Sequence, residues 1–153
     1  MSSPALHVLD ALVGEWTMHP SIAGHPTGLG RTVFEWSPDG SFLLQRAESA
    51  PSDIEIPDEW VANSPFPTHA VMGVDEESHE FSMLYGDARG VHRVYRMTLE
   101  GGTWTVWREA PGLHQRYVGR LGDHGATITG GWESSTDGSA WAPDFALDYR
   151  KIG

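Results

Sequence analysis

Turn-forming residues divide most of this chain into short segments, and their spacing limits the folds that it can adopt. After residue 36, seven turn signals rich in Gly, Asp, Ser or Pro follow one another: SPDG at 37–40, DEESHE at 75–80, GDARG at 86–90, LEGG at 99–102, APG at 110–112, GDHG at 122–125 and STDGS at 135–139. The segments between them, such as TWTVWRE, are typical of strands. Together with residues 14–19 they predict about ten β-strands, most of them joined by hairpin-length turns.

Ten sequential antiparallel strands favour an all-β fold, an up-and-down β-barrel. A two-sheet sandwich is the alternative, because its strands would alternate in the same way. Residues 4–13 precede the strands and place apolar side chains at helical spacing, with Pro4 at a suitable helix start and Gly14 after the end. The sequence therefore predicts a short N-terminal helix followed by a barrel.

The composition limits the domain count and excludes several classes of partner. A chain of 153 residues fits a single domain spanning 1–153. The net charge of -11 predicts no nucleic acid partner and no anionic membrane surface. The absence of Cys excludes a cysteine nucleophile and thiolate metal ligands. The N-terminus lacks the pattern of a signal peptide, which predicts a cytoplasmic protein.

One segment interrupts the regular spacing of strands and turns. Residues 50–67, APSDIEIPDEWVANSPFP, are acidic, rich in Pro and carry Trp60 and Phe66. Long loops in compact domains are usually functional lids or disordered. The two aromatic residues favour a lid that packs on the rest of the domain.

Two short signals at opposite ends of the chain carry a family resemblance. Gly14 and Trp16 form a Gly-x-Trp at the start of the first predicted strand, and Arg150 lies near the end of the last. This pairing resembles the calycins, the superfamily of lipocalins, fatty-acid-binding proteins and nitrobindins. The resemblance implies that Arg150 stacks on Trp16 and closes one end of the barrel, where a guanidinium over an indole is a favourable cation–π contact.

The resemblance extends over longer stretches of the chain. Residues 40–48, 94–119 and 126–138 are similar to a bacterial branch of calycin-like proteins. The resemblance implies the barrel fold and a cavity for a small ligand, but it does not indicate a particular substrate.

Alternate residues of a barrel strand point inward, and this periodicity places four polar groups near one mouth. Asp87, Arg93, Arg108 and Gln115 fall near strand ends joined by turns that lie on the same side of an up-and-down barrel. Tyr85, Tyr95 and Trp132 are expected below them. A mostly apolar cavity with a few converging polar groups is typical of a small-molecule site.

Two functions fit this arrangement. We expect the cavity to bind a small hydrophobic or amphiphilic ligand, with an anionic end met by Arg93 and Arg108. The alternative is a cofactor-independent isomerase, cyclase or lyase with His69 or Asp87 as the base, Tyr85 or Tyr95 as donor, and the two Arg as anion stabilisers. The lack of a dense acid–base cluster favours binding. A filled core, with Arg93 and Asp87 as a surface ion pair, would exclude both.

The histidines predict neither a metal site nor a cofactor. None of them forms HExxH or His-x-His. A nitrobindin-like heme would need an axial His on the closing strands, and the last one, His124, falls in a predicted turn. Trp36, Trp107 and Trp141 are expected to face outward, where such rings suit a homodimer interface.

Overall fold

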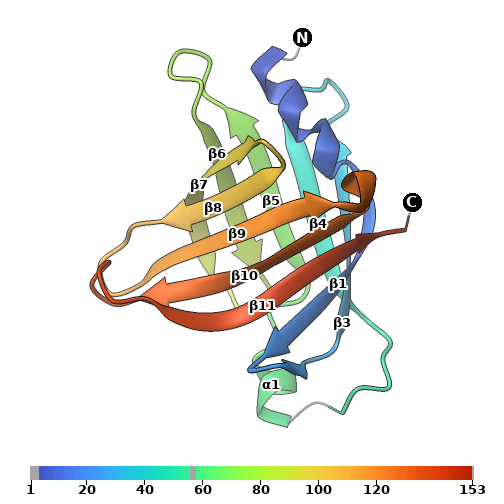
Figure 1. Ribbon diagram of the computed structural model, residues 1–153. Helices are drawn as coiled ribbons and strands as arrows, with labels where there is room; N and C mark the ends of the chain where they lie inside the picture. The colour runs from blue at the N-terminus through green and yellow to red at the C-terminus, as the bar shows by residue number, and fades with distance from the viewer. Residues whose placement is uncertain (1–3, 56–57, 153) are drawn as a thin grey trace.

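Ten antiparallel strands close into a barrel, with a short helix at one end (Figure 1). The structure is a computed structural model that describes residues 4–55 and 58–152. Its elements are η1 (Pro4–Leu12), β1 (Gly14–Ile22), β2 (His25–Pro26), β3 (Leu29–Trp36), β4 (Leu43–Ala50), α1 (Asp58–Ala62), β5 (Thr68–Val74), β6 (Phe81–Asp87), β7 (His92–Glu100), β8 (Thr103–Arg108), β9 (His114–Gly122), η2 (Asp123–Gly125), β10 (Thr127–Ser135) and β11 (Ala142–Lys151).

The strands form one sheet in which neighbours in sequence are neighbours in space. The order runs from β11 down to β3, then β1 and β2, and the sheet closes because β11 also pairs with β1. This confirms the predicted up-and-down barrel and excludes the sandwich. The two-residue β2 was not predicted; it pairs with the end of β1 and extends the hairpin to β3. In the described part of the chain, no helix has both the length and the apolar character to cross a membrane.

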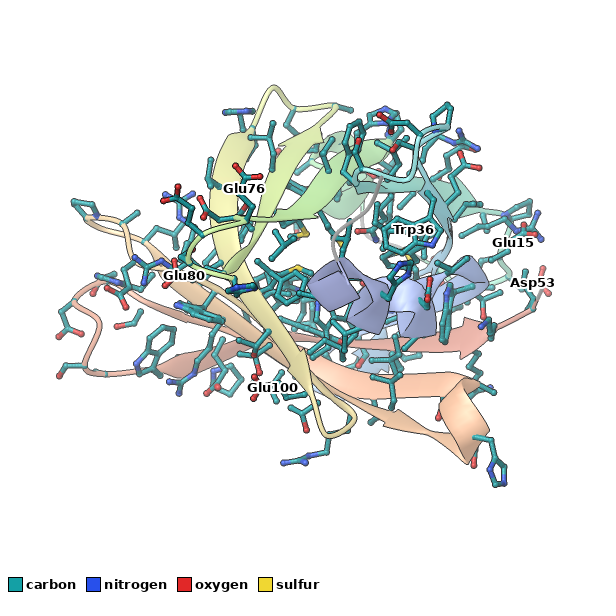
Figure 2. The ribbon with its side chains drawn as sticks, turned by 90° about the horizontal axis from the view of Figure 1, so that it is seen from above. Glu15, Trp36, Asp53, Glu76, Glu80 and Glu100 are labelled. Carbon is teal, nitrogen blue, oxygen red and sulfur yellow. The ribbon has the colours of Figure 1, made fainter. Side chains whose placement is uncertain are left out.

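The N-terminal helix plugs one end of the barrel. Its three leucines are buried: Leu6, Leu9 and Leu12. The indole N–H of Trp16 donates to the carbonyl of Leu12 at 2.9 Å, and that of Trp36 donates to Asp10 Oδ1 at 2.9 Å. Figure 2 looks down on this end, where η1 lies across the barrel with Trp36 beside it. The helix is a 3₁₀ helix, and it is fixed to the strands through two indoles.

The half of the barrel next to η1 is a filled core. Its inward side chains are exposed by no more than 5%: Trp16, Phe34, Leu43, Met72, Met97, Leu99 and Ile128. They alternate along their strands with exposed or half-buried residues, as a barrel wall requires. The alternative of a filled interior therefore describes this half of the molecule.

Lys151, and not Arg150, covers the ring of Trp16. In the pairing of β1 with β11, Trp16 lies opposite Lys151, and Thr17 lies opposite Arg150. The ammonium nitrogen of Lys151 is 5.3 Å from the centre of the indole. Adjacent residues of a strand point to opposite faces, so Arg150 is exposed on the outside. The Trp16–Arg150 contact expected from the resemblance is replaced by Trp16–Lys151.

Two glycines on facing strands make room for the ring of Tyr117. Gly119 of β9 lies opposite Gly130 of β10. A Cβ on Gly119 would come within 2.7 Å of the Tyr117 ring and 2.8 Å of Ile128, and one on Gly130 would collide with the carbonyl of Val118. The Tyr117 hydroxyl donates to the carbonyl of Leu147 at 2.9 Å. The glycines therefore hold Tyr117 against the wall, at the boundary of the filled half.

Candidate ligand-binding cavity

The half of the barrel away from η1 contains a cavity of about 770 Å³. Aromatic side chains from six strands line it: Tyr85, Tyr95, Trp104, Tyr117, Trp132, Phe145 and Tyr149. Their rings contact one another, with centroids 5.7 Å apart for Tyr95 and Trp132 and 5.5 Å for Tyr117 and Trp132. These large rings lie at inward positions and contact one another without filling the barrel. An apolar space therefore remains between the filled core and the end of the barrel opposite η1.

The connection between β4 and β5 contributes to the mouth of this cavity. Ile54, Val61 and Phe66 are among the lining residues, and Phe66 lies 3.2 Å from the position that a Cβ on Gly30 would occupy. Figure 1 places α1 at the end of the barrel opposite η1. Described residues of the segment 50–67 therefore line the cavity, and its action as a lid stays a prediction. The side chain of Trp60, also assigned to this lid, is outside the described residues.

A hydrogen-bonded group on the turn after β6 forms one side of the mouth. The hydroxyl of Tyr85 donates to Asp87 Oδ2 at 2.8 Å, and the guanidinium of Arg89 contacts the same oxygen at 2.7 Å. Burial raises the pKa of Asp87, but hydrogen bonds from Arg89 and Tyr85 outweigh this and lower it to about 2. Burial and the bond to Asp87 hold the pKa of Tyr85 well above its usual value. The carboxylate is therefore ionised and already neutralised by Arg89, not by Arg93.

Gln115 connects two other groups at the mouth. Its Oε1 accepts hydrogen bonds from Tyr95 Oη at 3.0 Å and from Arg93 at 3.2 Å. Burial raises the pKa of Tyr95, although the nearby charges of Arg93 and Arg108 act in the opposite direction. The hydrogen bond from Arg93 to Gln115 ends on a neutral amide, so it leaves the positive charge of Arg93 in place.

A groove of about 420 Å³ lies in the barrel wall between β7 and β8. Its lining comes from residues 92–96 and 107–110, so it includes Arg93, Arg96 and Arg108. Arg93 and Tyr95 line both the groove and the cavity, whereas Arg108 lines the groove alone. The two spaces are therefore neighbours that share part of one wall.

The structure brings the four predicted polar residues to one end of the barrel. Asp87 and Arg93 lie on either side of the turn from β6 to β7, and Arg108 lies opposite Gln115 in the pairing of β8 with β9. The three predicted aromatic residues line the cavity. His69 does not join this group: it lies between the inward-facing Thr68 and Ala70, and it is exposed.

The three tryptophans assigned to a dimer interface are half-buried, and two of them, Trp36 and Trp141, make side-chain contacts within the chain. Trp36 binds Asp10 and packs its ring edge-on against His7. The guanidinium of Arg116 lies 4.0 Å over the ring of Trp141. A homodimer stays a prediction.

Two features of the site were missed from the sequence. Arg89 forms an ion pair with Asp87. Its position two residues after Asp87, in the turn GDARG, could have predicted this pair. Trp104 is buried in the cavity lining, and the environment of its polar atom was not anticipated. Its indole N–H is buried and has no acceptor among the described residues. The N–H is enclosed by the packing of the wall, where a donor without a partner costs free energy of folding.

The comparisons with known proteins identify the fold and no family. No protein-family model matches the sequence, and no curated protein matches it closely enough to count as a relative. Among solved structures, the chain is similar to Rv2717c from M. tuberculosis, with a TM-score of 0.61, 14% identical residues and 100% of both chains covered. At this identity the likeness concerns the barrel alone.

Proposed function

We propose that this chain is a calycin-like barrel that binds a small hydrophobic or amphiphilic molecule in its cavity. The observation that carries the proposal is the aromatic-lined space of about 770 Å³ with a few polar groups at its mouth. Pockets for small molecules typically span about 300–1,000 Å³ and combine apolar walls with few polar anchors. The barrel of Rv2717c supports the fold assumed here.

The polar groups suggest how a ligand is oriented. Arg93, Tyr95 and Gln115 line the cavity and carry its polar groups near the mouth. A ligand with its apolar body against Tyr117 and Trp132 would direct a polar end to the mouth.

Binding is favoured over the alternative of acid–base catalysis. Asp87 has a pKa of about 2 and is held by Arg89, so it takes up protons poorly near neutral pH. His69, the other candidate base, is exposed on the outside of β5. Neither group has the position and protonation behaviour of a base that serves the cavity.

A dye titration with two matched variants tests the proposal. Anilinonaphthalene sulfonate should bind the protein saturably, and dodecanol should displace it. Ser134→Trp puts a large ring into the cavity lining and should weaken the binding of both the dye and dodecanol. Thr129→Trp puts the same ring on the exposed face of the same strand and is the control. The proposal is wrong if the dye does not saturate, or if both variants bind it like the parent protein.

A further inference from the structure

We infer that the groove between β7 and β8 is a binding site for an oxyanion, a carboxylate or a phosphate, at the end of the ligand. The inference rests on the proposed function, because it assigns the polar end of the molecule whose body occupies the cavity. The anionic group of the ligand is thus assigned to the groove in the barrel wall, and not to the mouth of the barrel.

The groove exists because two neighbouring strands separate. The pairs between β7 and β8 run from Glu100 with Thr103 to Arg96 with Trp107. From His92 to Tyr95, β7 pairs with β6 alone. Figure 1 shows β7 and β8 diverging toward the end opposite η1. Side chains of both strands consequently border a space that a continuous ladder would close.

Three arginines line this space without a carboxylate partner. Within residues 4–55 and 58–152, no ion pair of 4.0 Å or less includes Arg93, Arg96 or Arg108, although Glu109 also borders the groove. Other arginines are paired, as Arg89 is with Asp87. In a chain with a net charge of -11, this groove gathers three arginines and one carboxylate, Glu109.

The arginines come from both sides of the opening and from both faces of the wall. Arg93 and Arg108 follow the inward-facing alternation of their strands, and Arg96 lies on the exposed face of β7. A guanidinium presents a planar set of donors that matches the oxygens of a carboxylate or phosphate. An oxyanion in the groove would therefore meet donors from inside and outside the barrel.

The groove is positioned to receive one end of a cavity ligand. Arg93 and Tyr95 belong to both linings, so the apolar body of a ligand beside Tyr95 lies next to the groove that the three arginines line. On the adjoining turn between β6 and β7, Asp87 already neutralises Arg89. The arginines without an ion-pair partner line the groove between β7 and β8. We therefore assign the anionic end of the ligand to that groove.

The experiment compares three probes on four proteins at pH 7. Dodecanoate and dodecanol share a chain and differ in the oxyanion, and inorganic phosphate tests a free anion. The proteins are the parent chain, Arg96→Gln, Arg108→Gln and Arg120→Gln, the last being an exposed arginine on β9 with no carboxylate within 4.0 Å among the described residues. All three variants change the net charge equally.

We expect Arg96→Gln and Arg108→Gln to weaken dodecanoate about tenfold, in line with the loss of one charge-assisted hydrogen bond. Dodecanol should change less than about twofold, the scatter of such measurements, as should every probe with Arg120→Gln. Phosphate that binds alone and shows the same arginine dependence would also support the groove as an oxyanion site, with a free anion as its source.

The inference and the proposed function fail in different ways. If both alkyl probes bind but lose affinity equally in the groove variants, the groove is not an anion site and the cavity proposal stands. If neither alkyl probe binds, the proposed function fails. If dodecanoate binds the parent protein no more tightly than dodecanol does, and phosphate does not bind, the inference is overturned.

Discussion

The hydroxyl of Tyr85 donates a 2.8 Å hydrogen bond to Asp87, which ties a ring of the cavity wall to the turn between β6 and β7. Asp87 also accepts from the backbone N–H of Arg89 at 2.9 Å and from its guanidinium. One carboxylate therefore shapes the turn and holds the aromatic ring at the rim of the cavity. Its role in the site is to position Tyr85.

The first prediction concerns the pH dependence of stability through Asp87. Its pKa in the folded protein, about 2, lies below the ordinary value near 3.9, so the ionised carboxylate stabilises the fold. This contribution is complete above about pH 4 and is lost as the pH falls toward 2. Asp87→Asn should lower the free energy of unfolding at pH 7, and its difference from the parent protein should shrink between pH 4 and 2.

Urea unfolding at a series of pH values measures this difference. Asp53→Asn, at an exposed position, is the control and should follow the parent protein throughout. Equal pH profiles for Asp87→Asn and the parent protein would contradict the role given to this carboxylate.

The second prediction separates Lys151 from Arg150. Lys151 lies over the Trp16 ring, and an exposed cation–π contact contributes about 0.5–1 kcal/mol. Lys151→Ala should therefore lower the free energy of unfolding by an amount in this range, whereas Arg150→Ala should change it less. Chemical denaturation of both variants at low salt is the measurement. A larger loss in Arg150→Ala would show that the expectation from the calycin resemblance holds in solution.

The third prediction concerns the space around Tyr117. Gly119→Ala would push a methyl group into the Tyr117 ring and Ile128, and overpacking of this kind costs roughly 1–3 kcal/mol. Gly73→Ala is a matched control on β5, because a Cβ there meets nothing within 4 Å. We expect a lower melting temperature for the first variant and little change for the second. Similar behaviour of the two would contradict the close packing described for Tyr117.

The fourth prediction uses the size of the cavity. Trp132 contacts Tyr95, Tyr117 and Phe145, so Trp132→Ala should lower the free energy of unfolding by about 3 kcal/mol and enlarge the space. A bulky dye, bis-anilinonaphthalene sulfonate, should then gain affinity relative to the smaller single dye.

Trp141→Ala is the control for Trp132→Ala. It removes the same type of ring from outside the cavity lining, where Trp141 packs under Arg116. The preference between the two dyes should stay that of the parent protein. A shift of equal size in both variants would mean that the dyes bind outside the cavity.

Much of the barrel was predictable because local signals and the overall topology agree. The alternation of polar and apolar residues in 103–106, in a segment bounded by turn residues, is a two-residue period typical of a strand. In an up-and-down barrel, every second turn lies at the same end, which is why Asp87 and Arg108 could be assigned to one mouth. The inward faces of Tyr85 and Trp132 follow from the same alternation.

What escaped prediction depends on register and strand curvature. Whether Lys151 or Arg150 meets Trp16 is decided by a pairing between strands that are far apart in sequence, and a shift of one residue reverses the face. The separation of β7 from β8 has no local signal either, since residues 92–96 contain neither Gly nor Pro. Arg96 consequently carried no sign of belonging to a site, and the orphan N–H of Trp104 emerged only from the packing around it.

The plug formed by η1 has a consequence for how the cavity exchanges its contents. Because η1 closes one end of the barrel, a ligand enters the cavity from the opposite end. The water that it displaces must leave past it. The groove between β7 and β8 is a separate space that shares Arg93 and Tyr95 with the cavity lining. Water that leaves and a ligand that enters consequently share the end opposite η1, so the two movements are coupled.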